Sequence, residues 1–468
     1  MTLRAFRIDA PLLEALAGGG GGAGAVRLLA DAEYGRRLLL LRAVLDRARE
    51  HGGAVAAEVA ELFAVLARAR RVAPEATRRV LTHPSVGPRL VATWQTLAGP
   101  GPAAALPLSE VTAAVALASG LPDEVNLTAQ GPGAVLPGVG AAVLPDATPG
   151  SPVRLRDGVL AAEGGGSVPV RRLGAGPPGG AGADAPARAH APGEGETGWW
   201  ALRVLWAPGD GGPAAGGVVL DDVDPVAAPG VPRVRLGCGE VRAWQAAAAV
   251  ALRVLRVRHP GYAGEVAAGL RALVPLPGDA GAHRSGSAAE RFGGVTLTRP
   301  TGPLAFAETL VHEMQHSKLV ALMHLVDLLD TGPGPQPLLY APWRDDPRPP
   351  AGLLHGTYAF LSVARFWSVE AGAAAGPERR YDAQVRCARW REAAAETAGT
   401  LLAHGDVLTP TGRRFVTAMD AALAGLRRIP LPAPAVREAR RQAEEHRTRW
   451  RARHPAQGGD DRSPYRIV

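Results

Sequence analysis

The chain has 468 residues, of which 47 % are hydrophobic and 21 % are charged. These fractions are close to globular averages, so they exclude a chain that is disordered throughout. The formal net charge is +8, and Lys318 is the only lysine in the sequence. Because the arginines are dispersed among acidic residues and no nucleic-acid-recognition module is visible, we expect no nucleic-acid partner.

The two cysteines, Cys238 and Cys387, lie far apart in the sequence. They form neither a disulfide framework nor a metal-binding cluster of cysteines. The first 17 residues contain no uninterrupted apolar stretch of the kind found in secretory signals, and no window approaches the roughly 18 apolar residues of a membrane span. We therefore expect a cytoplasmic protein with no membrane partner.

The predicted fold class is α+β and mostly α-helical. In an N-terminal helical region, residues 1–122, apolar residues recur at spacings of three and four, as they do in amphipathic helices. The five glycines at 18–22 are expected to form a flexible connector. They lack the Gly-Lys-Ser/Thr sequence that completes a phosphate-binding loop, so we do not interpret them as one.

A β-rich region is predicted for residues 123–235, because short apolar runs alternate there with Gly, Pro and Asp. The expected strands are 134–139, 142–144, 153–155, 168–170, 199–206 and 217–220, and the last two ranges are expected to be one strand each. Residues 174–197 are almost entirely Gly, Ala, Pro or charged, and such a segment cannot bury enough apolar surface to fold. We expect a disordered loop there.

Residues 236–454 are predicted to be the metal-binding catalytic region, followed by a polar tail, 455–468. The apolar stretch 241–257 favours a helix, and 294–298 favours a short strand that is either internal to a sheet or an edge to which a peptide adds. The expected later helices are 301–330, 352–372, 378–404, 411–427 and 435–453.

The sequence His312-Glu313-Met314-Gln315-His316 matches the HExxH pattern. Histidines four residues apart project from one face of a helix, where both imidazoles can bind one metal ion. The alternative is a pair of solvated surface histidines. Glu308, one turn earlier, could accept a hydrogen bond from an imidazole N–H.

A metal site needs a third ligand. Leu319 and Leu322 stand where a metzincin would have a glycine and its third histidine, so that class is excluded. His324 is eight residues beyond His316, about 12 Å along a helix, and is too far away. We favour His355 as the third ligand, with Glu370 as the alternative and then Asp345 or Asp346.

Three segments resemble a bacterial family of HExxH peptide-modifying proteins: AETLVHEMQHSKL (307–319), YAPWRDDPRP (340–349) and GLLHGTYA (352–359). The family consists of 2-oxoglutarate-dependent peptide β-hydroxylases of ribosomal peptide biosynthesis, which stand alone or fused to radical-SAM peptide maturases. The resemblance implies an Fe(II)/2-oxoglutarate oxygenase that hydroxylates a side-chain β-carbon of a precursor peptide. It also implies a possible partner among peptide-maturation enzymes.

For such an enzyme, we expect His312, His316 and His355 to bind iron. A bidentate arginine should hold the distal carboxylate of 2-oxoglutarate, and Arg344 and Arg348 are better candidates than Arg365. The alternative role of these arginines is to pair with Asp345 and Asp346 in the loop.

Glu313 and Tyr358 are the candidate catalytic residues. In an oxygenase, Glu313 would orient a ligand or carry a proton. In a zinc metallopeptidase, the first alternative function, Glu313 would instead be the general base. The second alternative is a peptide-binding protein without catalysis. The spacing of the histidines does not distinguish iron from zinc, and Trp343 is expected either to line the site or to pack under the loop.

Overall fold

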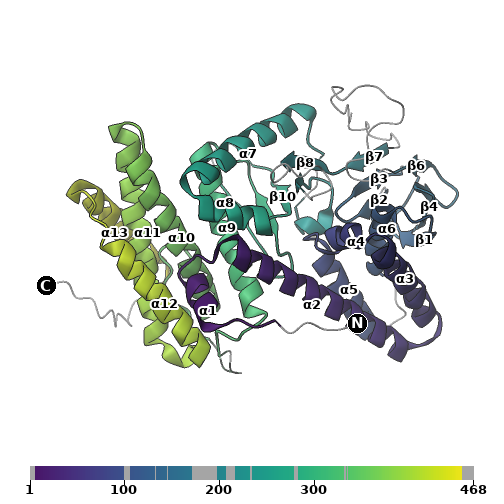
Figure 1. Cartoon of the computed structure of the whole chain (residues 1–468), viewed down its shortest axis with the longest axis horizontal. Coiled ribbons are helices and arrows are strands. Elements are labelled where there is room, and N and C mark those ends of the chain that lie inside the picture. The colour runs from purple at the N-terminus through teal and green to yellow at the C-terminus, as the bar shows by residue number, and fades with distance from the viewer. Residues whose placement is uncertain are drawn as a thin grey trace. The chain divides into compact units, whose positions relative to one another are not determined.

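The computed structural model describes residues 6–99, 106–131, 133–144, 146–170, 198–206, 217–231, 235–278, 283–330, 332, 334 and 336–455 (Figure 1). The described residues form thirteen α-helices and twelve β-strands, which confirms a mostly α-helical α+β fold. The loop predicted to be disordered, 174–197, and all of the predicted tail except residue 455 lie outside the described residues.

Contacts divide the described chain into two compact units. Unit 1 comprises residues 30–250 and 270–303, and unit 2 comprises residues 6–29, 251–269 and 304–455. Helices α2 (Gly22–His51) and α7 (Cys238–Arg258) contribute residues to both units. The domain boundaries expected after residues 122, 235 and 454 stay predictions.

Unit 1 contains three sheets. Two are antiparallel and have the strand orders β1-β4-β5-β6 and β2-β3-β7. Their bounds are β1 Val125–Thr128, β2 Gly133–Leu136, β3 Gly140–Val143, β4 Pro152–Arg156, β5 Val159–Ala162, β6 Ser167–Pro169 and β7 Gly198–Ala201. The sequence prediction missed β1 and β5, which are four residues long each.

The third sheet has the order β11-β12-β10-β9-β8, in which β9, β10 and β12 run parallel. Its bounds are β8 Arg203–Trp206, β9 Val218–Leu220, β10 Ala272–Pro275, β11 Ser285–Gly286 and β12 Gly294–Leu297. Because β12 pairs with β10 on one side and β11 on the other, it is an internal strand. The interpretation of 294–298 as a peptide-binding edge is therefore wrong.

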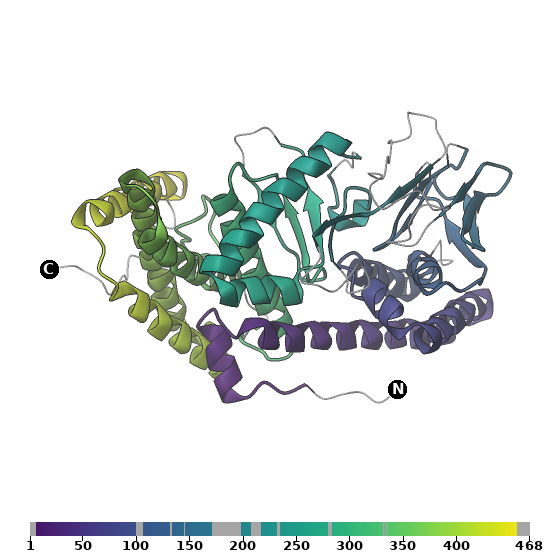
Figure 2. The ribbon, with the colours of Figure 1, turned by 45° about the horizontal axis from the view of Figure 1, so that its top comes forward.

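The helices of unit 1 pack beside the antiparallel strands (Figure 2, purple to blue). They are α3 Gly53–Val72, α4 Pro74–Leu81, α5 Val86–Ala98 and α6 Leu108–Ser119. Helix α6 is buried along nearly its whole length between α3, α4 and the strands β1 and β2, because small alanines on most of its faces allow close packing. Gly120 ends it in the left-handed conformation.

Unit 2 is helical. It contains α1 Ala10–Ala17, α8 Pro260–Gly269, α9 Pro303–Met323, α10 Pro350–Ala373, α11 Pro377–Ala403, α12 Pro410–Arg427 and α13 Ala433–Arg453. Helix α11 packs against α10, α12 and α13 (Figure 1, green to yellow). The observed α9 ends at Met323, one to two turns before the predicted end, and α8 was missed.

The five glycines at 18–22 form an ordered turn between α1 and α2, so the prediction of a flexible connector is wrong. Gly19 and Gly21 have φ angles of 74° and 98°, which glycine adopts without steric cost. A Cβ atom on Gly19 would also lie 2.6 Å from the Ser362 hydroxyl. Glycine is therefore required here for close packing against α10.

A buried charge cluster lies in unit 1. The Arg89 guanidinium donates to both carboxylate oxygens of Asp224, at 2.9 and 3.0 Å, and to Glu110 at 2.5 Å. Burial opposes ionisation of Asp224, but the Arg89 charge outweighs it and holds the pKa of that carboxyl below its usual value. The cluster joins α5, α6 and the segment after β9.

We predict that Arg89→Met destabilises the protein by about 3–5 kcal/mol, because it leaves two buried carboxylates without their cation. Urea unfolding followed by tryptophan fluorescence measures this loss. Arg42→Met is the control: Arg42 pairs with Asp46 on the exposed surface of α2, and its removal should leave the unfolding midpoint unchanged. Equal effects of the two substitutions would contradict the prediction.

Candidate metal centre

The two histidines of the HExxH motif lie one turn apart on α9, and their rings converge. The Nε2 atoms of His312 and His316 are 3.0 Å apart, and the ring planes meet at 77°. Both side chains are half-buried. The alternative of two solvated histidines on a helix surface does not fit this arrangement.

The pair fits a shared metal ion. Imidazole nitrogens bind zinc and similar ions at about 2.0–2.1 Å, so two ligands of one ion lie about 3 Å apart. Burial, with smaller contributions from His312 and His355, lowers the pKa of His316 to about 3, although Glu313 acts in the opposite direction. His316 is therefore neutral at pH 7, the protonation state that binds metals.

His355 lies beside this pair. It is in the second turn of α10, and its ring centroid is 5.7 Å from that of His316. Burial lowers the pKa of His355 to about 4, so it too is neutral at pH 7. Among the described residues, no three His, Cys, Asp or Glu side chains already form a metal-binding group. The role of His355 as third ligand thus stays a prediction.

Glu370, the alternative third ligand, is engaged elsewhere. Its carboxylate accepts hydrogen bonds from Arg258 at 2.7 Å and lies 2.8 Å from Nε2 of His259. It is 15 residues beyond His355 on the same helix, a rise of about 22 Å. Glu370 is therefore too far away to complete a site with His312 and His316, and this alternative is wrong.

The acidic residues of the preceding loop also have other partners. The Asp345 side chain is 63 % exposed and pairs with Arg453, and Asp346 accepts hydrogen bonds from Arg344 at 2.9 Å and Arg348 at 3.0 Å. In the described structure Arg344 and Arg348 thus pair with Asp346, as the alternative interpretation expected, whereas Asp345 pairs with Arg453 instead of with either of them. Their binding of 2-oxoglutarate stays a prediction.

The remaining sequence candidates lie in buried surroundings. Tyr358 is 1 % exposed, and its ring contacts Phe415 and lies 5.9 Å from Nζ of Lys318. Arg365 lies near the Tyr262 hydroxyl and influences its pKa. Glu308 accepts a hydrogen bond from the Trp367 indole at 2.9 Å rather than from a histidine, so its predicted role is wrong.

An aromatic wall lies beside the histidines and is formed by Phe360, Trp343 and Trp390. Sequence reasoning had named Trp343 as a residue that lines the site or packs under the loop, but it missed Phe360 and Trp390. The Phe360 ring lies 5.2 Å from that of His312, stacks on Trp343 at 4.8 Å, and lies 4.5 Å from Trp390. A Cβ atom on Gly356 would be 2.3 Å from the Trp343 ring, so a glycine next to His355 is what admits the indole. The sequence around residues 355–360 contains no pattern that predicts the contact between Phe360 and His312.

Comparison of the chain with protein-family models and with curated proteins finds no match. Within the described part of the chain, no helix combines the length and apolar character needed to cross a bilayer. The functional interpretation therefore depends on the site itself and on the resemblance of the segments around it.

We predict that His312→Ala and His316→Ala each abolish tight binding of Fe(II) or Zn²⁺, because each removes one of two converging ligands. Anaerobic titration calorimetry measures the affinity. The control is His324→Ala, since His324 is exposed just after the end of α9. Unchanged metal binding in both motif variants would remove the site.

A separate comparison tests the third ligand. His355→Ala should lower the metal content of the purified protein at least tenfold, whereas Glu370→Gln should retain the metal and lower the thermal unfolding midpoint, because it weakens a buried ion pair. Elemental analysis and thermal unfolding give the two readouts. Metal loss in Glu370→Gln alone would overturn this assignment.

Proposed function

We propose that the protein is an Fe(II)/2-oxoglutarate-dependent oxygenase that hydroxylates a side-chain β-carbon of a ribosomally made precursor peptide. The observation that carries the proposal is the convergence of His312 and His316 beside His355. The sequence resemblance covers the same helices and adds the choice of iron over zinc. Such an enzyme would act in the cytoplasm, where precursor peptides are made, and a peptide-maturation enzyme would be its partner.

The bound iron, with 2-oxoglutarate and O₂, would supply the oxidising chemistry. In that chemistry one atom of O₂ would enter the peptide C–H bond and the other would enter succinate, with release of CO₂. The chain's own residues would bind the peptide, orient its side chain and exclude water from the site. The wall of Phe360, Trp343 and Trp390 presents apolar rings next to His312. A site that protects a reactive centre from solvent needs such an apolar surface.

Two further groups have roles in the proposal. Glu313 is 2 % exposed between the two histidines in the motif, where a carboxylate can orient a ligand or carry a proton. The distal carboxylate of 2-oxoglutarate needs a bidentate cation, and Arg344 and Arg348 supply two guanidinium groups in the loop before α10. Binding the cofactor there would require one of them to exchange Asp346 for it.

A zinc metallopeptidase is the second candidate, because the same helix supports it. Glu313 has the position that the general base of such an enzyme occupies in the motif. In that reaction Glu313 is indispensable, whereas a hydroxylase uses no general base. This difference makes Glu313 the residue that distinguishes the two functions.

We predict that aerobic incubation with a candidate precursor peptide, Fe(II) and 2-oxoglutarate adds the mass of one oxygen atom to the peptide and releases one succinate per hydroxylation. Mass spectrometry with ¹⁸O₂ identifies the source of the oxygen. His312→Ala should be inactive, and Glu313→Gln should retain partial activity.

Cleaved peptide in the presence of Zn²⁺, with complete loss of cleavage in Glu313→Gln, would instead establish the peptidase. Saturable binding of the peptide with no change of its mass under either condition would indicate a peptide-binding protein without catalysis.

A further inference from the structure

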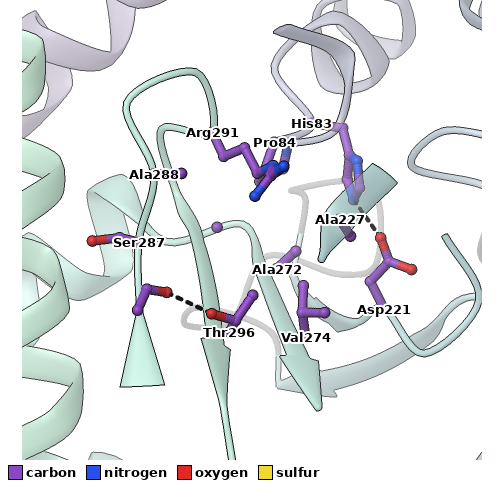
Figure 3. Close-up of a pocket in the computed structure, with 12 residues that line it drawn as sticks. His83, Pro84, Asp221, Ala227, Ala272, Val274, Ser287, Ala288, Arg291 and Thr296 are labelled. Atoms are coloured by element: carbon purple, nitrogen blue, oxygen red, sulfur yellow. Dashed lines mark hydrogen bonds and ion pairs between the residues drawn. The ribbon is translucent and has the colours of Figure 1, made fainter. Parts of the chain in front are cut away.

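A separate pocket lies in unit 1, on one face of the sheet that contains β10 and β12 (Figure 3). Its volume is about 120 Å³. Ala272 and Val274 of β10 form an apolar wall, and the turn that carries His83 and the segment that carries Arg291 border the same space. None of these residues belongs to the histidine site on α9 and α10.

Arg291 is a cation without a counter-ion in this pocket. It is half-buried, its Nε atom is inaccessible to solvent, and that atom makes no hydrogen bond within the described structure. Of the described carboxylates, none lies within ion-pair distance of Arg291, and Asp224, which acts on it electrostatically, is held by both outer nitrogens of Arg89. A buried polar group of this kind costs stability unless something binds it.

Several other arginines of unit 1 have partners for their outer nitrogens, although Nε of Arg203, like Nε of Arg291, makes no hydrogen bond within the described structure. Arg89 binds two carboxylates, Arg203 and Arg235 both bind Asp222, and Arg37 donates to two backbone carbonyls. The burial of Arg291 also lowers its pKa, which is the expected direction for a cation removed from water without compensation. The contrast indicates that the partner of Arg291 comes from outside the described chain.

His83 provides a second polar atom without a hydrogen bond. Its side chain is 6 % exposed, Nδ1 lies 2.9 Å from the Ser85 hydroxyl, and Nε2 has no hydrogen-bond partner among the described residues. Nε2 lies 3.8 Å from Oδ2 of Asp221, too far for a hydrogen bond. A ligand group seated beside the line that joins them, about 2.8 Å from each, would reach both atoms.

We propose that this pocket binds a small carboxylate that also carries a hydroxyl or ammonium group. The carboxylate pairs with Arg291, which can hold it through two parallel hydrogen bonds. The hydroxyl or ammonium group donates to Asp221 and contacts His83, and the short carbon chain lies on Ala272 and Val274. Ala288, exposed at the rim of the pocket, marks the side from which such a ligand enters.

The test is a calorimetric titration of the full, metal-free chain with glycolate, glycine, acetate and uncharged glycolamide. Glycolate or glycine should bind saturably and more tightly than acetate, and glycolamide should not bind. Preference for glycolate assigns a hydroxy acid, and preference for glycine assigns an amino acid. Equal binding of acetate would overturn the role of His83 and Asp221, and absence of saturable binding by any of these carboxylates would overturn the site.

Arg291→Gln should weaken binding of the preferred probe at least tenfold. The matched control is Arg299→Gln, because Arg299 is an exposed arginine just after β12. Arg291→Gln should also keep the wild-type unfolding midpoint, since it breaks no ion pair. If that variant does not fold, Arg291→Lys replaces it: the lysine keeps the charge but loses the planar fork, and undiminished binding would overturn the proposal.

The same titration on His312→Ala separates this pocket from the histidine site. Binding of the probes should be unchanged in that variant, and its loss would show that they bind at α9 instead. The result is independent of whether the chain hydroxylates a peptide.

Discussion

The antiparallel packing of α9 against α10 is the constraint on which the candidate metal centre depends. Three contacts follow one another along the two helices: Glu308 with Trp367, His312 with Phe360, and His316 with His355. Residue numbers rise along α9 as they fall along α10, so a single register places a third imidazole next to the pair. A shift of one turn would bring a different side chain to the position of His355.

A buried polar contact anchors another side of α9. Nζ of Lys318 donates to the carbonyl of Gly20 at 2.7 Å and to Glu265 of α8 at 2.9 Å, and Glu265 also accepts the backbone N–H of Gly22. Burial lowers the pKa of Lys318, and the Glu265 carboxylate opposes this change. The chain's only lysine therefore joins α8, α9 and the glycine turn, and a compact ammonium suits a contact so close to the backbone.

Much of unit 2 could be predicted because its signals are local. Proline in or just before the first turn marks the start of each helix from α10 to α13, and the predicted bounds agree with the observed ones to within a few residues. The spacing of His312 and His316 determines that their rings share a face. The sequence could not show that Glu370 is unable to bind the metal. Its carboxylate is held by Arg258 and His259, which lie more than 100 residues away in the sequence.

The glycine turn was misjudged for the same reason. A run of glycines indicates flexibility only when no other part of the chain packs against it, and here Ser362 and Lys318 do so. The pocket of unit 1 lay beyond any sequence pattern, because His83, Asp221 and Arg291 come from three distant segments. Short strands such as β1 and β10 are likewise set by their pairing partners rather than by their own residues.

The surroundings of the histidine pair also bear on the choice between hydroxylase and peptidase. A peptidase must admit a water molecule to the metal and hold that water against Glu313, so the surroundings of its metal should be polar and open to solvent. A hydroxylase must keep water away while the substrate carbon is near the metal. Phe360 lies directly against His312 and is backed by two indoles, so this side of the pair is apolar. Such an apolar side is what the proposed hydroxylase needs next to its metal, although Phe360, Trp343 and Trp390 are each only half-buried and leave their outer edges to solvent.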